Sequence, residues 1–441
     1  MRRQRARTVF AFAALFSLWD GDGVRDALSW WGFSAVSLVL LVLSVIMIVQ
    51  ERRALRRLLL SWSAVPVLAF TAICLLSTAW SNYPLVTALA CLIQIGTSTI
   101  GLAVLLSGPP RHIVFVFGLM LHVHLVLALL FEVGVALSPA GQILPLWTNY
   151  GANVPGAYYW SQGLIFQGGR IQGIVANANL TCFIALLALI LLAALVRARA
   201  IRPLLLIPAV VVDVLAIALT RSATVLIAGG LVLVTALIVL GYRRFGRRGR
   251  IALGVVAVGT VAAVGLGSSR LFAPLLRVLG KGDDFTGRFE IWRLVWEKAQ
   301  ERPALGWGWI SYWAPWVDPY RRLVIRDGVQ YLQAHNAYLD VVLQVGLPGQ
   351  VALVAIVGSV VHRSLRLALV PAPYTALPLL LVVALLTQAL AESRLLIEGN
   401  WALLVMLAVA VPSVDRSRAA AAALRAAEAP EDGAAVPAPA L

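Results

Sequence analysis

The sequence has few charged residues and few cysteines. Only 13% of its 441 residues are charged, whereas 61% are hydrophobic; soluble globular chains are about a quarter charged and about half apolar. An ordinary soluble domain is therefore excluded, and a polytopic membrane protein is indicated. Cys74, Cys91 and Cys182 lie inside apolar runs without paired or metal-ligand spacing, so we expect neither a disulfide framework nor a zinc site.

Long apolar runs make up most of the chain. A spanning helix needs about 20 apolar residues, and the runs predict an all-α protein with twelve transmembrane helices. The N-terminal run also fits a secretory signal peptide, but no small-residue cleavage site follows it, so we favour a span. The predicted spans lie at about 1–19, 30–50, 58–80, 85–107, 112–137, 171–196, 202–219, 221–241, 251–267, 337–362, 374–391 and 395–413.

The net charge of +16 would fit a nucleic-acid-binding protein if the basic residues formed a patch. Threading twelve spans with the N-terminus inside places 22 of the 36 Lys and Arg residues on the cytoplasmic side. This distribution is the positive-inside pattern of membrane proteins. We therefore expect no nucleic-acid partner, and we expect both termini in the cytoplasm.

The predicted spans divide the chain into four parts. Residues 1–267 hold helices one to nine, with an extracytoplasmic loop at about 138–170, and residues 268–336 form one large extracytoplasmic loop. Residues 337–414 hold helices ten to twelve. Residues 415–441 are rich in Ala, Pro and Glu, which predicts a disordered cytoplasmic tail.

The large loop carries most of the polar residues that could take part in binding or catalysis. Apolar residues recur at helical spacing over 287–302, which predicts an amphipathic helix on the outer surface, with Arg288 at the leading edge of its apolar stripe. Trp307 lies in a Gly-Trp-Gly-Trp turn that fits either a sugar-stacking wall or an interfacial aromatic belt. His335 and Asn336 precede the next span, and a lone His is more often structural than catalytic.

Arginines also stand at the outer ends of other spans. Arg221 lies in a tight turn between two apolar runs, and Arg170 precedes a span within a glycine-rich stretch. Each could be an interfacial residue that reaches lipid phosphate. Three arginines and a histidine that converge without metal ligands would instead suit an anionic phosphate substrate, because Arg offers two hydrogen bonds to phosphate oxygens. Adjacent Asp283 and Asp284 lack metal-site context, so we expect neither a metal nor another cofactor.

Motifs between residues 170 and 400 resemble the O-antigen ligase and O-antigen polymerase family, which includes exopolysaccharide polymerases. The resemblance is carried by the order and spacing of GRIQGIVANAN, LTRSA, GRFEIW with RPALGWGW, AHNAYLDVVLQVGLPG, and AESRLLIEGNWALL. The first 137 residues match only as generic spans. Members of this family look like twelve-span bundles with one large periplasmic loop near the C-terminal end.

The resemblance implies a cell-envelope glycosyltransferase in the bacterial cytoplasmic membrane. Its partners would be a polyprenyl-diphosphate-linked glycan donor, a glycan or glycolipid acceptor, and membrane lipid. The family's functional positions correspond to Arg221, Arg288 and His335. Arg170, Asn336, Trp307, Glu392 and Arg394 are the predicted substrate-binding residues.

The implied reaction is a metal-independent transfer that inverts the anomeric centre, and it does not separate a ligase from a polymerase. A transporter of a lipid-linked glycan or an anionic solute is the alternative from another class. Such a protein would need charged or broken helices near the bilayer midplane and repeat symmetry. Apart from Asp213, the predicted midplane is nearly free of charge, which favours an enzyme.

Overall fold

A computed structural model describes residues 2–149, 151, 154–259, 262, 284–326 and 329–411. Almost all regular structure in these residues is helical. The two-residue strands β1 (Ile325–Arg326) and β2 (Val329–Gln330) form an antiparallel pair. The predicted tail at 415–441, the first part of the large loop and the end of the predicted span at 251–267 lie outside the described residues.

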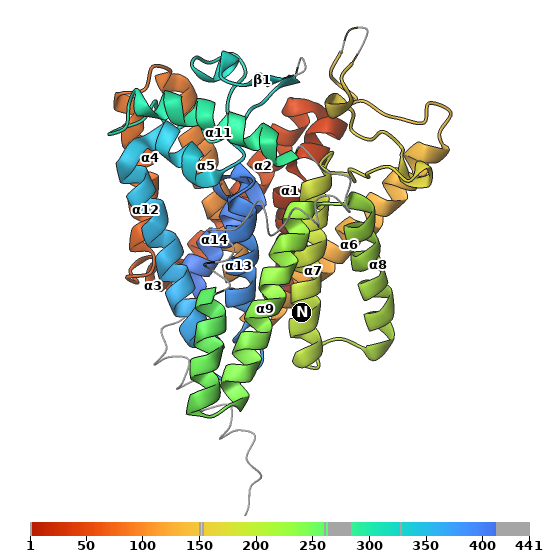
Figure 1. The fold of residues 1–441 in the computed structure, drawn as a ribbon, viewed down its shortest axis with the longest axis vertical. Coiled ribbons are helices and arrows are strands. Elements are labelled where there is room, and N and C mark those ends of the chain that lie inside the picture. Colours follow the sequence, from red (N-terminus) through yellow and green to blue (C-terminus); the bar gives the residue numbers. More distant parts are fainter. Residues whose placement is uncertain are drawn as a thin grey trace, which may run out of the picture.

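The helices form a bundle that is elongated along one axis (Figure 1). Residues 247–259 form a further helical run after α9. Short 3-10 turns connect several helices, and η6 (Ser393–Leu396) lies between the last two. The named α-helices are α1 (Arg2–Trp19), α2 (Gly21–Gln50), α3 (Arg52–Leu59), α4 (Val65–Leu76), α5 (Pro84–Leu106), α6 (Pro110–Leu137), α7 (Ala178–Arg197), α8 (Leu206–Thr220), α9 (Ala223–Arg244), α11 (Asp284–Gln300), α12 (Ala337–Ala368), α13 (Leu377–Ala389) and α14 (Glu398–Ala410).

Seven helices of the described part are long and apolar enough to cross a membrane, and three shorter apolar helices accompany them. The chain is therefore a multi-pass helical membrane protein. Each predicted run within the described residues contains a helix, but α13 and α14 have only 13 residues each. At 1.5 Å per residue they measure about 20 Å, less than the roughly 30 Å hydrocarbon core. The count of twelve spans stays a prediction.

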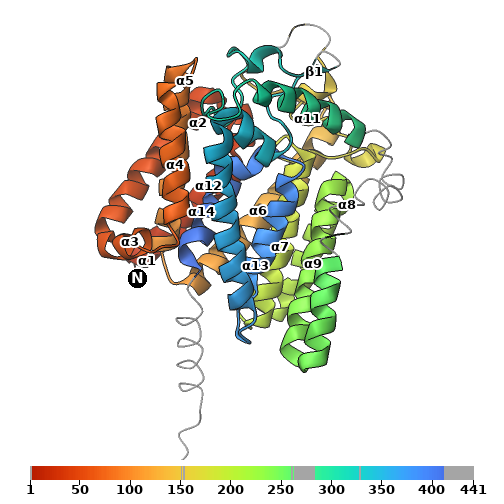
Figure 2. The ribbon, with the colours of Figure 1, turned by 60° about the vertical axis from the view of Figure 1, so that its left-hand side comes forward.

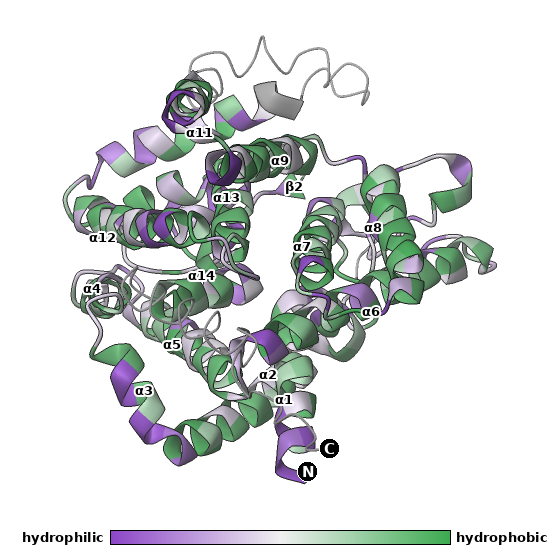
Figure 3. Cartoon of the chain, turned by 90° about the horizontal axis from the view of Figure 1, so that it is seen from below, coloured by the Kyte–Doolittle hydropathy of each residue, from purple (hydrophilic) through white to green (hydrophobic). Residues whose placement is uncertain are grey.

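Apolar side chains cover the outside of the bundle. Viewed along its axis, the outward faces of most helices are hydrophobic (Figure 3). Leu89 and Ile93 of α5, Val214 of α8 and Leu233 of α9 are between 52% and 60% exposed. A large exposed apolar surface of this kind is expected where lipid, rather than water, surrounds the protein. The centre is occupied by α7 and α14, and almost every residue of α14 is buried.

Helix α11 lies across one end of the bundle, beside the β1–β2 pair (Figures 1 and 2). Its residues Ile291, Val295 and Ala299 are buried and pack in a cluster with Trp313 and Leu343. The amphipathic pattern at 287–302 thus forms a helix whose stripe covers the bundle. Trp296 falls on the same apolar stripe by helical spacing, but it is 48% exposed.

The start of α12 fixes the long segment that follows α11. The Asp340 carboxylate accepts hydrogen bonds from the Trp313 indole (2.7 Å) and from the Ala334 backbone N–H (3.0 Å). Gln344 accepts two more from the backbone N–H groups of Ile310 and Ser311. Because both residues are buried, these bonds stabilise one conformation of the segment.

Helix α7 begins later than the predicted span at 171–196. Asn177 lies before the helix in an extended conformation, and its side chain accepts a hydrogen bond from the backbone N–H of Leu180. This is an N-cap, which satisfies one of the free N–H groups of the first turn. Residues 171–177 are therefore not helical, and the sequence prediction was wrong at this boundary.

Candidate functional site

Glu392 stands at the centre of a group of polar side chains, which we name the Glu392 cluster. Its Oε1 accepts hydrogen bonds from Asn179 Nδ2 (2.9 Å) and Arg288 Nη2 (3.2 Å), and its Oε2 accepts from Gln333 Nε2 (3.2 Å) and His335 Nδ1 (2.9 Å). Glu392 is only 4% exposed. The cluster consists of Glu392, Asn179, Arg288, Gln333 and His335, and it joins four separate parts of the chain.

The carboxylate of Glu392 is held in its charged form. Burial by itself raises the pKa of Glu392. The charge and hydrogen bond of His335 and the charge of Arg288 outweigh that effect and lower the pKa to about 2. Bonds to a carboxylate from charged donors are stronger than neutral ones. Glu392 therefore acts here as a fixed anion, suited to positioning the groups around it.

His335 contacts Glu392 through one of its two ring nitrogens, Nδ1. Because an ionised carboxylate can only accept, we assign the proton to Nδ1, which leaves the Nε2 lone pair able to accept a proton. The Tyr331 ring packs edge-on to the imidazole at 5.7 Å. His335 also has φ +50°, a backbone state that is uncommon outside glycine and is frequent at functional sites.

Arg288 bridges the turn that contains Glu392 and the start of α9. It lies in the first two turns of α11, and its Nη1 is 3.4 Å from Thr224 Oγ1 while Nη2 contacts Glu392. Its side chain is 14% exposed. The amphipathic pattern of α11 explains this position, because burial of Ile291 and Val295 directs Arg288 toward the bundle.

Arg170 reaches the cluster through Asn179. Its Nε donates to the Thr220 backbone carbonyl at 2.8 Å, and its Nη2 donates to Asn179 Oδ1. The Ser222 hydroxyl donates to the same oxygen at 2.9 Å. Asn179 thus accepts from Arg170 and donates to Glu392, so it connects the predicted substrate-path arginine with the predicted catalytic residues.

Arg221 lies between two residues that contact this network, but its own side chain is exposed. It ends α8 in the left-handed conformation, with φ 48° and ψ 44°. No hydrogen bond or ion pair joins its guanidinium to another residue in the part of the chain that the structure describes. The structure places Arg221 beside the cluster without a direct contact to His335 or Arg288.

Arg394 belongs to a different group, although it is only two residues from Glu392. Arg394 donates to Asp22 Oδ2 and to Glu398 Oε2 (3.1 Å), while Arg25 donates to Asp22 Oδ1 and to Glu398 Oε1 (2.9 Å). All four carboxylate oxygens have a guanidinium partner. We name these four residues the closed ring. The nearby acids raise the pKa of Arg394 even though burial lowers it.

Asn336 has the contacts of a helix cap. Its Oδ1 accepts from the backbone N–H groups of Tyr338 and Leu339, and its own N–H donates to the Ser393 hydroxyl at 3.2 Å. The first contacts hold the start of α12, and the last ties this turn to the segment that contains Glu392. The geometry thus gives Asn336 a part in placing His335.

Trp307 lies away from the Glu392 cluster. Its indole N–H donates to the Lys298 carbonyl at the end of α11, and its ring is partly buried. The turn around it is packed, because a Cβ on Gly306 would lie 2.5 Å from backbone atoms of Gln344. Gly308 has φ 108° and is equally close to Ser81. Glycine is therefore required at both positions.

Sequence reasoning missed several members of these groups. Gln333 precedes His335 by two residues, and its proximity in the motif was the available signal. Asn179 lies in the GRIQGIVANAN motif nine residues after Arg170, and an amide at that position is also typical of helix packing. The acids of WDGDG near the N-terminus drew no attention, yet Asp22 closes the ring and Asp20 lies 3.5 Å from His124 Nε2.

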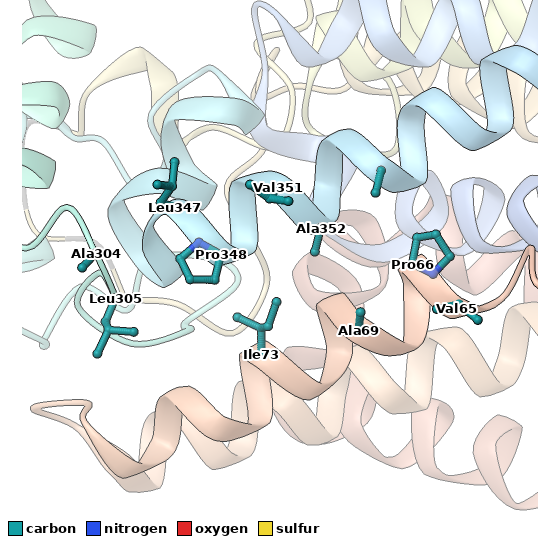
Figure 4. Close-up of a pocket in the computed structure, with 11 residues that line it drawn as sticks. Val65, Pro66, Ala69, Ile73, Ala304, Leu305, Leu347, Pro348, Val351 and Ala352 are labelled. Atoms are coloured by element: carbon teal, nitrogen blue, oxygen red, sulfur yellow. The ribbon is translucent and has the colours of Figure 1, made fainter.

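A groove in the described structure is lined without any polar side chain. It is an open groove of about 790 Å³ between α4 and α12, lined by residues such as Val65, Ile73, Leu305 and Val351 (Figure 4). Such a wall offers no hydrogen bond to a glycan or a phosphate. Among the described residues no three His, Cys, Asp or Glu side chains are placed to hold a metal ion.

These features define a class of protein: a multi-pass helical membrane protein with a buried cluster of charged residues beneath a surface helix. Residues 208–354 match the family model described as O-antigen ligase. The match supports the O-antigen ligase and polymerase family, and it includes three of the motifs that carry the resemblance: LTRSA, GRFEIW with RPALGWGW, and AHNAYLDVVLQVGLPG. It includes Arg221, Arg288 and His335, whereas Arg170, Glu392 and Arg394 lie outside it. A search of curated proteins finds no match.

Proposed function

We propose that this protein transfers a glycan from a polyprenyl diphosphate donor to a hydroxyl group of an acceptor sugar, at the outer face of the bacterial cytoplasmic membrane. The family match supports a membrane glycosyltransferase of the O-antigen ligase or polymerase type. The observation that carries the proposal is that the buried carboxylate of Glu392 holds Arg288 and His335 together in one cluster. The match gives no support to a transporter.

The acceptor hydroxyl oxygen attacks the anomeric carbon, and the bond from that carbon to the diphosphate oxygen breaks. The bonding electrons leave with the polyprenyl diphosphate. The proton of the hydroxyl passes to His335 Nε2, a role that contributes typically about 10²- to 10⁴-fold in rate. Because the acceptor attacks from the side opposite the leaving group, the configuration at the anomeric carbon inverts.

The leaving diphosphate gains negative charge as the bond breaks. Arg288 and Arg221 stabilise that charge, since guanidinium groups form paired hydrogen bonds with phosphate oxygens. Arg221 is exposed beside the cluster and would reach the diphosphate as it binds. Arg170 holds the turn that carries Arg221 through its bond to the Thr220 carbonyl. In this mechanism arginines do the work that a metal ion does in other phosphate sites.

The proposal is tested with purified protein and a lipid-linked oligosaccharide donor. We expect Arg288→Ala and His335→Ala to abolish transfer at normal protein levels. Arg293→Ala is the matched control, because Arg293 lies on the same helix, is 61% exposed and pairs only with Glu297 in the described part of the chain. Equal activity of all three variants would refute the site. Excess chelator should leave wild-type activity unchanged.

Ligase and polymerase activities differ in what accumulates when the protein is removed. We expect a deletion strain to accumulate lipid-linked glycan, because the donor is no longer consumed. Single repeat units on the lipid would indicate a polymerase, whereas long chains on the lipid would indicate a ligase. A strain with unchanged lipid-linked glycans would contradict both assignments.

A further inference from the structure

A polar pocket lies at the C-terminal end of α11, whereas Arg288 lies near the other end of this helix. Its volume is about 430 Å³, within the range of about 300–1,000 Å³ that small-molecule sites occupy. It is formed by the α4–α5 turn, the last turn of α11 and the segment around η5 (Tyr320–Arg322). The residues that matter are Asn82, Lys298, Trp307, Asp318 and Arg322.

The wall of this pocket carries more positive than negative charge. Lys298 Nζ and the Arg302 guanidinium carbon lie over the Trp307 ring, 4.3 and 4.2 Å from its centre. Arg322 lines the pocket directly, and Asp318 is the acid among the lining residues. Lys298 also pairs with Glu301 at 2.7 Å, but Glu301 is 53% exposed, and such surface pairs are weak.

The pocket is built on fixed backbone. The backbone N–H of Trp307 donates to the Leu343 carbonyl at 3.0 Å, and the backbone N–H of the next residue, Gly308, donates to the Gln344 carbonyl at 2.8 Å. Both acceptors lie on α12. The Trp307 ring thus forms a platform that holds Lys298 and Arg302 by cation–π contact. We assign it this role rather than that of a surface on which a sugar stacks.

The pocket and the Glu392 cluster share one helix. Lys298 follows Arg288 by ten residues, so their Cα atoms are about 15 Å apart along α11. Because α11 lies across one end of the bundle (Figure 1), both sites lie at that end. A chain-like substrate bound in the cluster can therefore continue along α11 to the pocket.

We infer that this pocket binds a carboxylate-bearing sugar of the glycan chain, and so holds the part of the chain that extends away from the reacting end. Arg322 and Lys298 supply the charge that a sugar carboxylate requires, and arginine can bind it through two hydrogen bonds. Asn82 and Asp318 offer groups for sugar hydroxyls. The inference rests on the proposed function for the identity of the chain.

The test is a binding measurement that requires no turnover. An acidic uronate oligosaccharide and its neutral methyl ester are titrated into the full-length protein in nanodiscs by calorimetry. We expect the acidic form to bind at least about fivefold more tightly, and Arg322→Ala and Lys298→Ala each to remove most of that preference. Arg322 is exposed, so its replacement should not affect folding. Arg293→Ala is the control.

The inference is overturned if both oligosaccharides bind alike, or if Arg322→Ala binds the acidic form as tightly as Arg293→Ala does. His335→Gln separates this result from the proposed function, because it should stop transfer and leave binding unchanged. If Arg322→Ala still transfers glycan and binds the acidic oligosaccharide as the wild type does, the pocket inference is refuted and the proposed function is not. If the wild type prefers the acidic oligosaccharide but transfers no glycan, the proposed function is refuted and the pocket inference is not.

Discussion

The Glu392 cluster and the closed ring are both partly buried groups that contain charged residues. Their members Glu392 and Arg394 are separated by one residue in the sequence. In the closed ring, two acids meet two arginines and each carboxylate oxygen has its own guanidinium partner. In the Glu392 cluster, one acid is shared by an arginine, a histidine and two amides. The charges of the closed ring therefore pair with one another. In the Glu392 cluster, His335 contacts the carboxylate through Nδ1, and Nε2 is the nitrogen that can accept a proton.

This difference indicates different roles. The closed ring ties the start of α2 to η6 and α14, and so fixes the turn that contains Glu392. Breaking a buried ion pair by removing one partner costs about 3–5 kcal/mol, because the other charge is left without compensation. The cluster contains a group that can move a proton. We therefore expect the ring to determine stability and the cluster to determine the reaction rate.

Replacing His335 should give the largest effect on rate. His335→Gln removes the proton acceptor, and we expect the rate of glycan transfer to fall by about 10²- to 10⁴-fold. The melting temperature should change little, because the side chain is partly exposed and Gln can still donate to Glu392. Initial rates and thermal unfolding of the purified variant check both statements. A loss of stability that matches the loss of rate would contradict the comparison.

Replacing Arg394 should give the largest effect on stability. Arg394→Gln leaves Asp22 and Glu398 each without one partner, and we expect the free energy of unfolding to fall by about 3 kcal/mol. Transfer per folded molecule should stay within a few-fold of wild type. Thermal unfolding in detergent, with activity normalised to folded protein, measures both. A protein of normal stability with no transfer would show that Arg394 contacts the substrate.

Glu392→Gln should lower both the stability and the rate of transfer, and its effect on stability should depend on pH. The pKa of Glu392 is lowered from its usual value of 4.5 to about 2, so its charged form stabilises the fold by about 3 kcal/mol. That stability is complete above the unfolded pKa and is lost as pH falls through about 2. The stability difference from wild type should be constant from pH 8 to 5 and shrink below about pH 4.

The rate of Glu392→Gln supplies the second half of that prediction. A neutral amide no longer fixes the proton on His335 Nδ1, and we expect transfer to fall by about tenfold to a hundredfold at neutral pH. A pH-independent stability difference would show that Glu392 has the same pKa in the folded and the unfolded protein, which would contradict the lowered pKa. The unfolding midpoints are measured between pH 3 and 8.

Arg221→Gly should give the smallest change in stability. Arg221 has φ 48° and an exposed side chain, and glycine adopts this backbone conformation without steric cost. We expect stability within about 1 kcal/mol of wild type, and a loss of transfer of about tenfold. Arg221→Lys should recover only part of the rate, because an ammonium lacks the paired donors. Unchanged transfer in Arg221→Gly would remove Arg221 from the mechanism.

Local patterns in the sequence predicted α11 and the main helices. Ile291, Val295 and Ala299 recur at helical spacing, and they form the buried face of α11. The boundary of α7 was missed because the apolar run continues upstream of the Asn177 cap. That signal was readable, since Asn is favoured before a helix.

The long-range contacts could not be predicted from one sequence. Asp22 and Arg394 lie 372 residues apart, and no local pattern indicates that they form an ion pair. The placement of Arg288 near His335 came from the family resemblance rather than from periodicity. The structure adds that Glu392, predicted as a substrate-binding residue, lies between them as a buried anion.

The most direct test of the account is a double-mutant cycle between Glu392 and His335, measured as the initial rate of glycan transfer per folded molecule. If Glu392 acts through His335, Glu392→Gln should have almost no further effect once His335 is Gln, so the double variant should transfer within about twofold of His335→Gln. Losses that multiply in the double variant would contradict the account, because the two residues would then act independently.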